Sequence, residues 1–107
     1  MENVVSVAYK VVTADMKSLG LRKNPNIITY PVGEWYFLPK EDVVPGDDDF
    51  GGIWVTRRFS DAKRLVRYMS EKYSVEARIF KARIGEVLYQ NSYRLKTDRV
   101  FLDEEVC

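Results

Sequence analysis

Only one stretch of this 107-residue chain carries a helical pattern of apolar residues, and β-like segments stand on both sides of it. The apolar positions recur every three or four residues and so share one stripe of an amphipathic helix: Ala62, Leu65, Val66, Met69 and Tyr73. Ser60 is a suitable N-cap, and Asp61 places a negative charge in the first turn, where it favours the helix dipole. The pattern therefore predicts one main amphipathic helix over about 60–73.

The rest of the chain alternates between short strand-like runs and turns rich in glycine, proline and asparagine. Residues 4–13 are apolar on both faces, which predicts a central strand. Further strands are predicted at residues 27–30, 34–38, 53–56, 76–84, 86–90, 93–95 and 99–102. We therefore expect a single domain over residues 1–107, of class α+β. Its bent, mostly antiparallel sheet of about six strands packs on the one main helix.

Positive charge is concentrated on the helix and the strands next to it. Residues 57–83 hold nine Lys and Arg against three Asp and Glu, a local net charge of +6, although the whole chain carries only +1. This pattern indicates an anionic partner, either nucleic acid or another phosphate-bearing molecule. The candidate anion-binding residues are Arg57, Arg58, Lys63, Arg64 and Arg67. The alternative interpretation is a solvated helix face that keeps the protein soluble.

Residue types that are scarce exclude several kinds of chemistry. The chain has no histidine and only one cysteine, Cys107, which excludes Ser–His and Cys–His nucleophile pairs, an internal disulfide and a structural zinc site. Gly51 and Gly52 lack the spacing of a phosphate-binding P-loop, and the acidic run at 47–49 lacks that of a calcium loop. We therefore expect no metal and no cofactor, and favour a non-enzymatic binding or regulatory protein.

No apolar run is long enough to span a membrane, and the first residues lack the features of a signal peptide. The sequence therefore predicts a cytoplasmic protein without a membrane partner. Amides are few and charges are many, which is typical of thermophile proteins.

The middle of the chain resembles small uncharacterised viral and microbial domains, and its arrangement is similar to the ADP-ribosyltransferase-like split β-fold. The resemblance rests on Gly52-Ile53-Trp54-Val55-Thr56, on Ser60-Asp61-Ala62 opening a helix, and on the run from Ile84 to Tyr89. It covers about half of the chain, and it implies an NAD-binding domain that is catalytically degenerate.

In that family an aromatic residue of the G-x-aromatic strand stacks near nicotinamide, and a first-strand aromatic residue with Arg or His lies by the ribose. The resemblance thus implies a ligand-binding set made of Tyr9, Lys10, Trp54, Thr56 and Ser60. Lys10 stands where the family has Arg or His, and Trp54 where it has Tyr or Ser. For the catalytic glutamate, Glu86 is the nearest residue by order along the chain.

Three consecutive aromatic residues, Trp35, Tyr36 and Phe37, cannot all point into the core of one strand. At least one of Trp35 and Tyr36 is therefore expected to be partly exposed. An exposed aromatic patch or an open sheet edge also allows a third interpretation, a protein–protein interaction module or homodimer.

Overall fold

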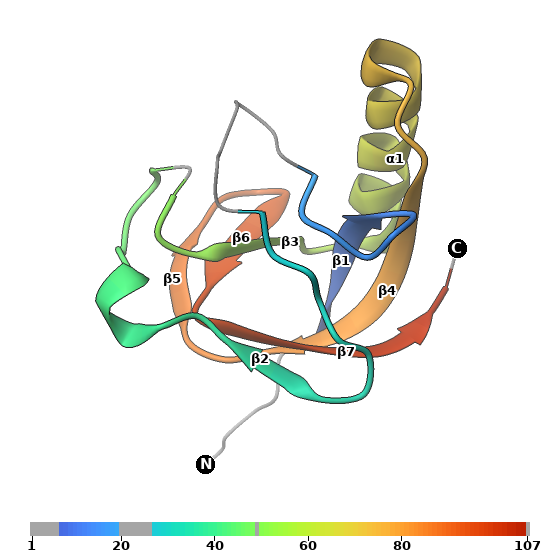
Figure 1. Cartoon of the computed structure of the whole chain (residues 1–107). Coiled ribbons are helices and arrows are strands. Elements are labelled where there is room, and N and C mark those ends of the chain that lie inside the picture. The colour runs from blue at the N-terminus through green and yellow to red at the C-terminus, as the bar shows by residue number, and fades with distance from the viewer. Residues whose placement is uncertain (1–6, 20–26, 49, 107) are drawn as a thin grey trace.

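In the part of the chain that the structure describes, seven strands form one open antiparallel sheet, against which one long helix packs (Figure 1). This computed structural model describes residues 7–19, 27–48 and 50–106. The elements are β1 (Val7–Thr13), β2 (Trp35–Phe37), the 3-10 turn η2 (Lys40–Asp42), β3 (Ile53–Thr56), α1 (Phe59–Tyr73), β4 (Ala77–Ile84), β5 (Val87–Gln90), β6 (Arg94–Thr97) and β7 (Arg99–Glu105). The predicted α+β class with a bent sheet is confirmed, with seven strands instead of about six.

The strands lie in the order β2-β7-β4-β1-β3-β6-β5, so β1 has three strands on each side. Its central position is confirmed, and the reason is that both of its faces are covered: Ala8 and Val12 are buried on one side and Val11 on the other. Residues 4–6 of the predicted strand lie outside the described residues.

The two faces of the sheet have different covers. On the inner face, residues from β1, β3, β4, β6 and β7 form the larger core, and the segment that carries Met16, Ile28 and Tyr30 packs against it. On the outer face, α1 packs through Ala62, Leu65 and Val66 against Val11 and Ile79. Directly paired residues of an antiparallel ladder point to the same face of the sheet. Thr56 and Arg94 therefore lie on the outer face with Tyr9, and so does the pair formed by Trp54 and Lys96.

The helix begins earlier than its capping pattern predicts. Arg58 is the N-cap, with an extended backbone at φ −128° and ψ 153°, so the assignment of Ser60 as the N-cap is wrong. The physical reason lies in β3, because the main-chain N–H of Arg57 still donates to the Tyr93 carbonyl at 3.0 Å. The chain leaves the sheet only at Arg58, whose carbonyl accepts the first helical bond from Ala62. The helix then ends at Tyr73, as predicted.

The predicted strand at residues 27–30 does not form a ladder. Among the described residues it makes one bridge, between Thr29 and Lys17. Beside this bridge the Ser18 N–H donates to the Ile28 carbonyl, and the Tyr30 N–H donates to the Met16 carbonyl. The apolar side chains of this segment serve instead to cover the inner face. No helix in the described part of the chain is long and apolar enough to cross a membrane.

Candidate anion-binding face

The cationic residues at the start of α1 converge with the β5–β6 turn. Both segments are held together because β3 pairs with β6, which brings Thr56 opposite Arg94 and the following arginines beside residues 90–93. The side chain of Arg57 donates to the Gln90 Oε1 and to the Asn91 carbonyl, both at 3.3 Å. The short turn thus fixes the direction of an exposed arginine.

Asp61 organises the second part of this face. Its side chain is only 5% exposed, and it accepts a hydrogen bond from the Arg58 Nε at 3.0 Å while the Arg64 guanidinium lies 3.9 Å away. The two guanidinium groups remain largely in solvent, with side chains 66% and 77% exposed. Arg58 also donates to the Ser92 carbonyl at 3.5 Å. One buried carboxylate therefore positions two exposed arginines without cancelling their joint charge.

The other two predicted cations lie on the exposed surface of the same helix. Lys63 and Arg67 are exposed one turn apart, and the Lys63 ammonium lies 5.2 Å from the Phe59 ring. All five predicted anion-binding residues are exposed. Three of them, Arg57, Arg58 and Arg64, make the side-chain contacts described above. We call these five residues, Arg57, Arg58, Lys63, Arg64 and Arg67, the basic face. Ser60 lies on the exposed surface among them.

The helix start adds a weaker contribution of its own. The N-cap Arg58 makes no side-chain capping hydrogen bond, and the one negative charge in the first turn of α1, that of Asp61, is shared with two arginines. Anions bind well at such positions when side-chain cations stand beside them. The first turn of α1 and the basic face therefore both favour the binding of an anion.

The residues implied by the family resemblance are divided between the two faces of the sheet. Tyr9 and Thr56 are directly paired on the outer face, and the Thr56 hydroxyl donates to the carbonyls of Tyr9 and Arg58. The Tyr9 ring lies 5.6 Å from the Phe59 ring of α1. Neighbouring residues in a strand point to opposite faces, so Lys10 enters the inner core instead.

Lys10 is buried there, 7% exposed, beside the Tyr30 ring at 5.0 Å. Its ammonium donates to the Trp54 carbonyl at 2.9 Å across the point where β1 and β3 separate. Burial lowers the pKa of Lys10 to about 8 because the charged form loses its hydration.

The Trp54 ring is covered by neighbouring side chains. The Arg94 guanidinium lies 3.9 Å from the Trp54 ring centroid, and the Tyr89 ring meets it edge-on at 6.0 Å. All three residues lie on the outer face, on adjacent strands. The ring surface that the resemblance assigns to a ligand is therefore in contact with an arginine of the protein itself.

Lys96 is a buried charged residue that the sequence analysis did not single out. Its side chain is completely buried, and its ammonium donates to the main-chain carbonyls of Gly46 and Asp48 at 3.0 Å each. It passes over Gly52, where a Cβ would collide with the lysine side chain. Its burial follows from its position opposite Trp54 in the ladder, which cannot be read from the sequence without the strand pairing.

Through these two hydrogen bonds Lys96 anchors the loop that carries the acidic run 47–49. Asp49 of this run lies outside the described residues. Within the described ranges, no group of three or more Asp, Glu or Cys residues is arranged to hold a metal ion.

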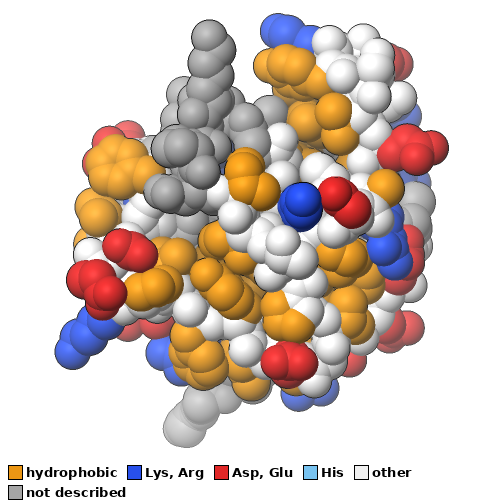
Figure 2. All heavy atoms as spheres, in the orientation of Figure 1, with side chains coloured by type: hydrophobic (Ala, Val, Ile, Leu, Met, Phe, Trp, Pro, Cys, Tyr) orange, Lys and Arg blue, Asp and Glu red, His pale blue; other side chains and the backbone are white. Residues whose placement is uncertain are grey.

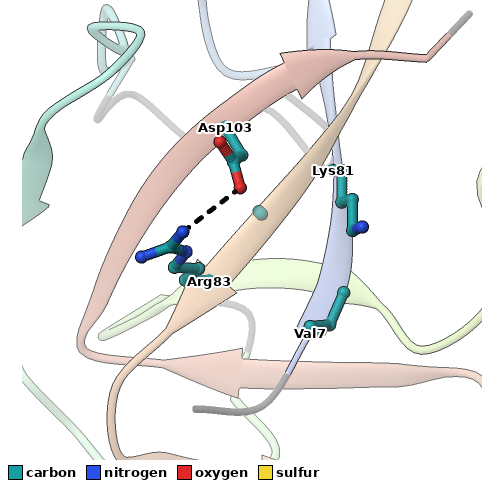
Figure 3. A pocket seen from close by; sticks show the side chains of 5 residues that line it. Val7, Lys81, Arg83 and Asp103 are labelled. Carbon is teal, nitrogen blue, oxygen red and sulfur yellow. Dashed lines mark ion pairs between the residues drawn. The ribbon is translucent and has the colours of Figure 1, made fainter.

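A shallow hollow of about 280 Å³ lies elsewhere, over β1, β4 and β7 (Figure 3). Figure 3 shows Val7 and Lys81 on one side of it and the ion pair between Arg83 and Asp103, at 3.6 Å, on the other. Because Arg83 is neutralised by this partner, the hollow carries less net charge than the basic face.

Comparison of the chain with protein-family models, with curated proteins and with solved structures finds no match in any of the three.

Proposed function

We propose that this protein binds a phosphate-bearing anionic partner, such as nucleic acid, through the basic face. The observation that carries the proposal is that one buried carboxylate, Asp61, orients Arg58 and Arg64, while the β5–β6 turn orients Arg57 next to them in the chain. Guanidinium groups held at fixed positions suit phosphate oxygens, which accept two parallel N–H bonds.

Charge around this junction supports the proposal. The five cations of the basic face outnumber the acidic residues of the helix, which are Asp61 and Glu71. The contacts of Arg58 and Arg64 with Asp61, and of Arg58 with the Ser92 carbonyl, occupy only part of the two guanidinium groups, whose side chains stay 66% and 77% exposed. A solvated face without a partner would not require a buried acid to orient its arginines.

The experiment measures binding of labelled single-stranded and double-stranded oligonucleotides by fluorescence anisotropy over a range of salt concentrations. We expect affinity to fall steeply with salt, because phosphate contacts release counterions. The double variant Arg57→Gln with Arg64→Gln should bind more weakly and lower the salt slope by about two.

The matched control is Lys17→Gln with Lys81→Gln, which removes the same charge from exposed or half-exposed positions outside the basic face. Equal effects of the two double variants would show that only net charge matters. Absence of binding at low salt, or binding that salt does not change, would contradict the proposal.

NAD binding, which the family resemblance implies, stays a prediction with its own test. Titration with millimolar NAD should shift the NMR signals of the Trp54 indole and of Tyr9 if the ligand enters between β1 and β3. Unchanged signals would remove this second function and leave the basic-face proposal untouched.

A further inference from the structure

The strand β2 forms one margin of the sheet and pairs with β7 alone within the described part of the chain (Figure 1). The Leu38 amide donates to the Asp98 carbonyl, and Tyr36 lies opposite Val100 two residues further along. Hydrogen-bonded and non-bonded pairs alternate in an antiparallel ladder, so the main chain of Tyr36 also turns toward β7. The N–H and C=O groups of Trp35 and Phe37 consequently point away from the sheet.

Aromatic rings gather on the outer face beside this open edge. Trp35 is 38% exposed and Phe37 is 56% exposed, and the Trp35 ring lies 6.1 Å from Phe37 and 5.6 Å from Phe101 of β7. We call these three residues the aromatic ladder. In the orientation of Figure 1, the space-filling view shows hydrophobic side chains exposed at several places on this face, some of them in the lower part of the molecule (Figure 2).

Two arginines hold the aromatic ladder in place. The Arg83 guanidinium lies 5.3 Å from the Phe101 ring, and that of Arg99 lies 5.1 Å from the Phe37 ring. Each arginine is paired with a carboxylate of its own copy, Asp103 or Asp98. A partner that covers the ladder would therefore meet large rings and neutralised arginines, and no unpaired charge would be buried.

We propose that two copies of this chain pair through β2, antiparallel to each other about a two-fold axis at Tyr36. In this register Trp35 lies opposite the partner's Phe37, and Phe37 lies opposite the partner's Trp35. The outward main-chain groups of both strands become paired, and the two seven-stranded sheets join into one. Both aromatic ladders then share one face without interruption.

Symmetry favours a second copy over a different extended chain. The strand has one central residue with a large ring on each side, so self-pairing matches ring with ring at both positions. Pro31 and Pro39 stand beyond the two ends and restrict the pairing to this short segment. Closed pairing also removes an edge that would otherwise accept further strands without limit.

A three-residue strand offers few hydrogen bonds, so the aromatic contacts supply most of the affinity. We expect a dimer that dissociates on dilution. The measurement is sedimentation equilibrium over a wide range of protein concentrations, with circular dichroism to verify that each variant is folded.

Two substitutions of Phe37 test the interface, one through charge and one through the loss of a main-chain donor together with the ring. Phe37→Lys places two like charges close to the axis and should shift the protein to monomer. Phe37→Pro removes both the aromatic ring and the outward N–H, which β7 does not use, and should weaken the dimer at least tenfold while the fold persists. The matched control is Tyr93→Thr, which removes an aromatic ring that is 48% exposed at the other end of the sheet, and it should leave the dimer unchanged.

A wild-type protein that stays monomeric at every concentration would overturn the proposal. A dimer that persists in both Phe37 variants would also overturn it, because the interface would then lie elsewhere. Isotope-filtered NMR contacts between Trp35 of one copy and Phe37 of the other would establish the register directly.

Discussion

Lys10 and Lys96 are both buried in the folded protein, but their ammonium groups have different surroundings. Lys10 has one main-chain acceptor and an aromatic ring in the inner core, whereas Lys96 bridges two carbonyl groups of a loop on the outer face. Long lysine side chains are rarely buried to this degree without polar partners. Each of them therefore affects stability through a separate mechanism.

For Lys10 we predict that stability rises with pH in mildly alkaline solution. Its pKa falls from 10.5 to about 8 on folding, so between these values the unfolded chain binds more protons than the folded one. The free energy of unfolding should increase by up to about 2 kcal/mol between about pH 7.5 and 9.5. Urea denaturation at several pH values measures this increase.

The variant Lys10→Met should lose this rise, whatever its absolute stability. The predicted rise in the free energy of unfolding ends below pH 10. Burial raises the pKa of Tyr30 to about 12, so above pH 10 this tyrosine ionises in the unfolded chain first and lowers the free energy of unfolding. If wild type and Lys10→Met show the same pH dependence, the lysine is not the titrating group.

For Lys96 we predict that substitution by Ala destabilises the protein by about 2–4 kcal/mol. The change removes a buried aliphatic chain and leaves the carbonyls of Gly46 and Asp48 without this donor. Amide hydrogen exchange should accelerate most at Val44 and Gly46, whose N–H groups bond to Gly51 and Leu88. Gly52→Ala should have a similar local effect, since its Cβ collides with the lysine side chain. Uniform acceleration over the whole sheet would argue against a role confined to the loop.

At the scale of elements, α1 shows both the strength and the limit of a periodic pattern. Its apolar stripe and its end at Tyr73 follow from residues that lie close together in sequence. Its start differs from the predicted one because the Arg57 N–H remains bonded to the carbonyl of Tyr93 in the β5–β6 turn, a residue far along the chain. The separate prediction of a strand at residues 27–30 was wrong for a related reason, since its apolar residues cover the inner face without forming a ladder.

The C-terminal end of α1 offers a test of backbone strain. Ser74 adopts a left-handed conformation at φ 56°, where glycine is favoured, and its N–H donates to the Ser70 carbonyl at 3.1 Å. Ser74→Gly should therefore raise stability by about 0.5–1 kcal/mol, measured as an increase in Tm. Ser70→Gly, inside the same helix and also exposed, should lower it by a similar amount. A decrease in both variants would mean that the strain at Ser74 is negligible.

At the scale of the whole molecule, the two proposed surfaces lie at opposite ends of the strand order. The open edge belongs to β2, and the basic face adjoins the turn between β5 and β6. Pairing through β2 would place two basic faces at the far ends of one continuous sheet. Such an assembly suits long anionic partners that can reach both ends.

We therefore predict that affinity depends on the length of the anionic partner. An oligonucleotide long enough to reach both basic faces should bind the wild-type dimer at least tenfold more tightly than a short one, because the second contact becomes intramolecular. Phe37→Lys should abolish this length dependence and keep the affinity for the short oligonucleotide. Anisotropy titrations with oligonucleotides of several lengths measure both quantities. A length dependence that persists in Phe37→Lys would mean that it does not come from dimerisation, and would contradict the prediction.

The α+β class, the single long helix and the central position of β1 were determined by the sequence itself. These features depend on periods of about two and 3.6 residues and on turn residues, which are local properties of a chain. The concentration of cations around α1 was equally visible, as was the exposure of part of the run from Trp35 to Phe37.

Tertiary structure alone decided which strands are neighbours and what surrounds each charge. The burial of Lys10 and Lys96, the contact of Arg94 with Trp54 and the orientation of two arginines by Asp61 all join segments distant in sequence or depend on such pairings. Strand order does not follow from alternation, because any amphipathic strand can pair with several others. A side chain acquires its partners only when the sheet has closed around it.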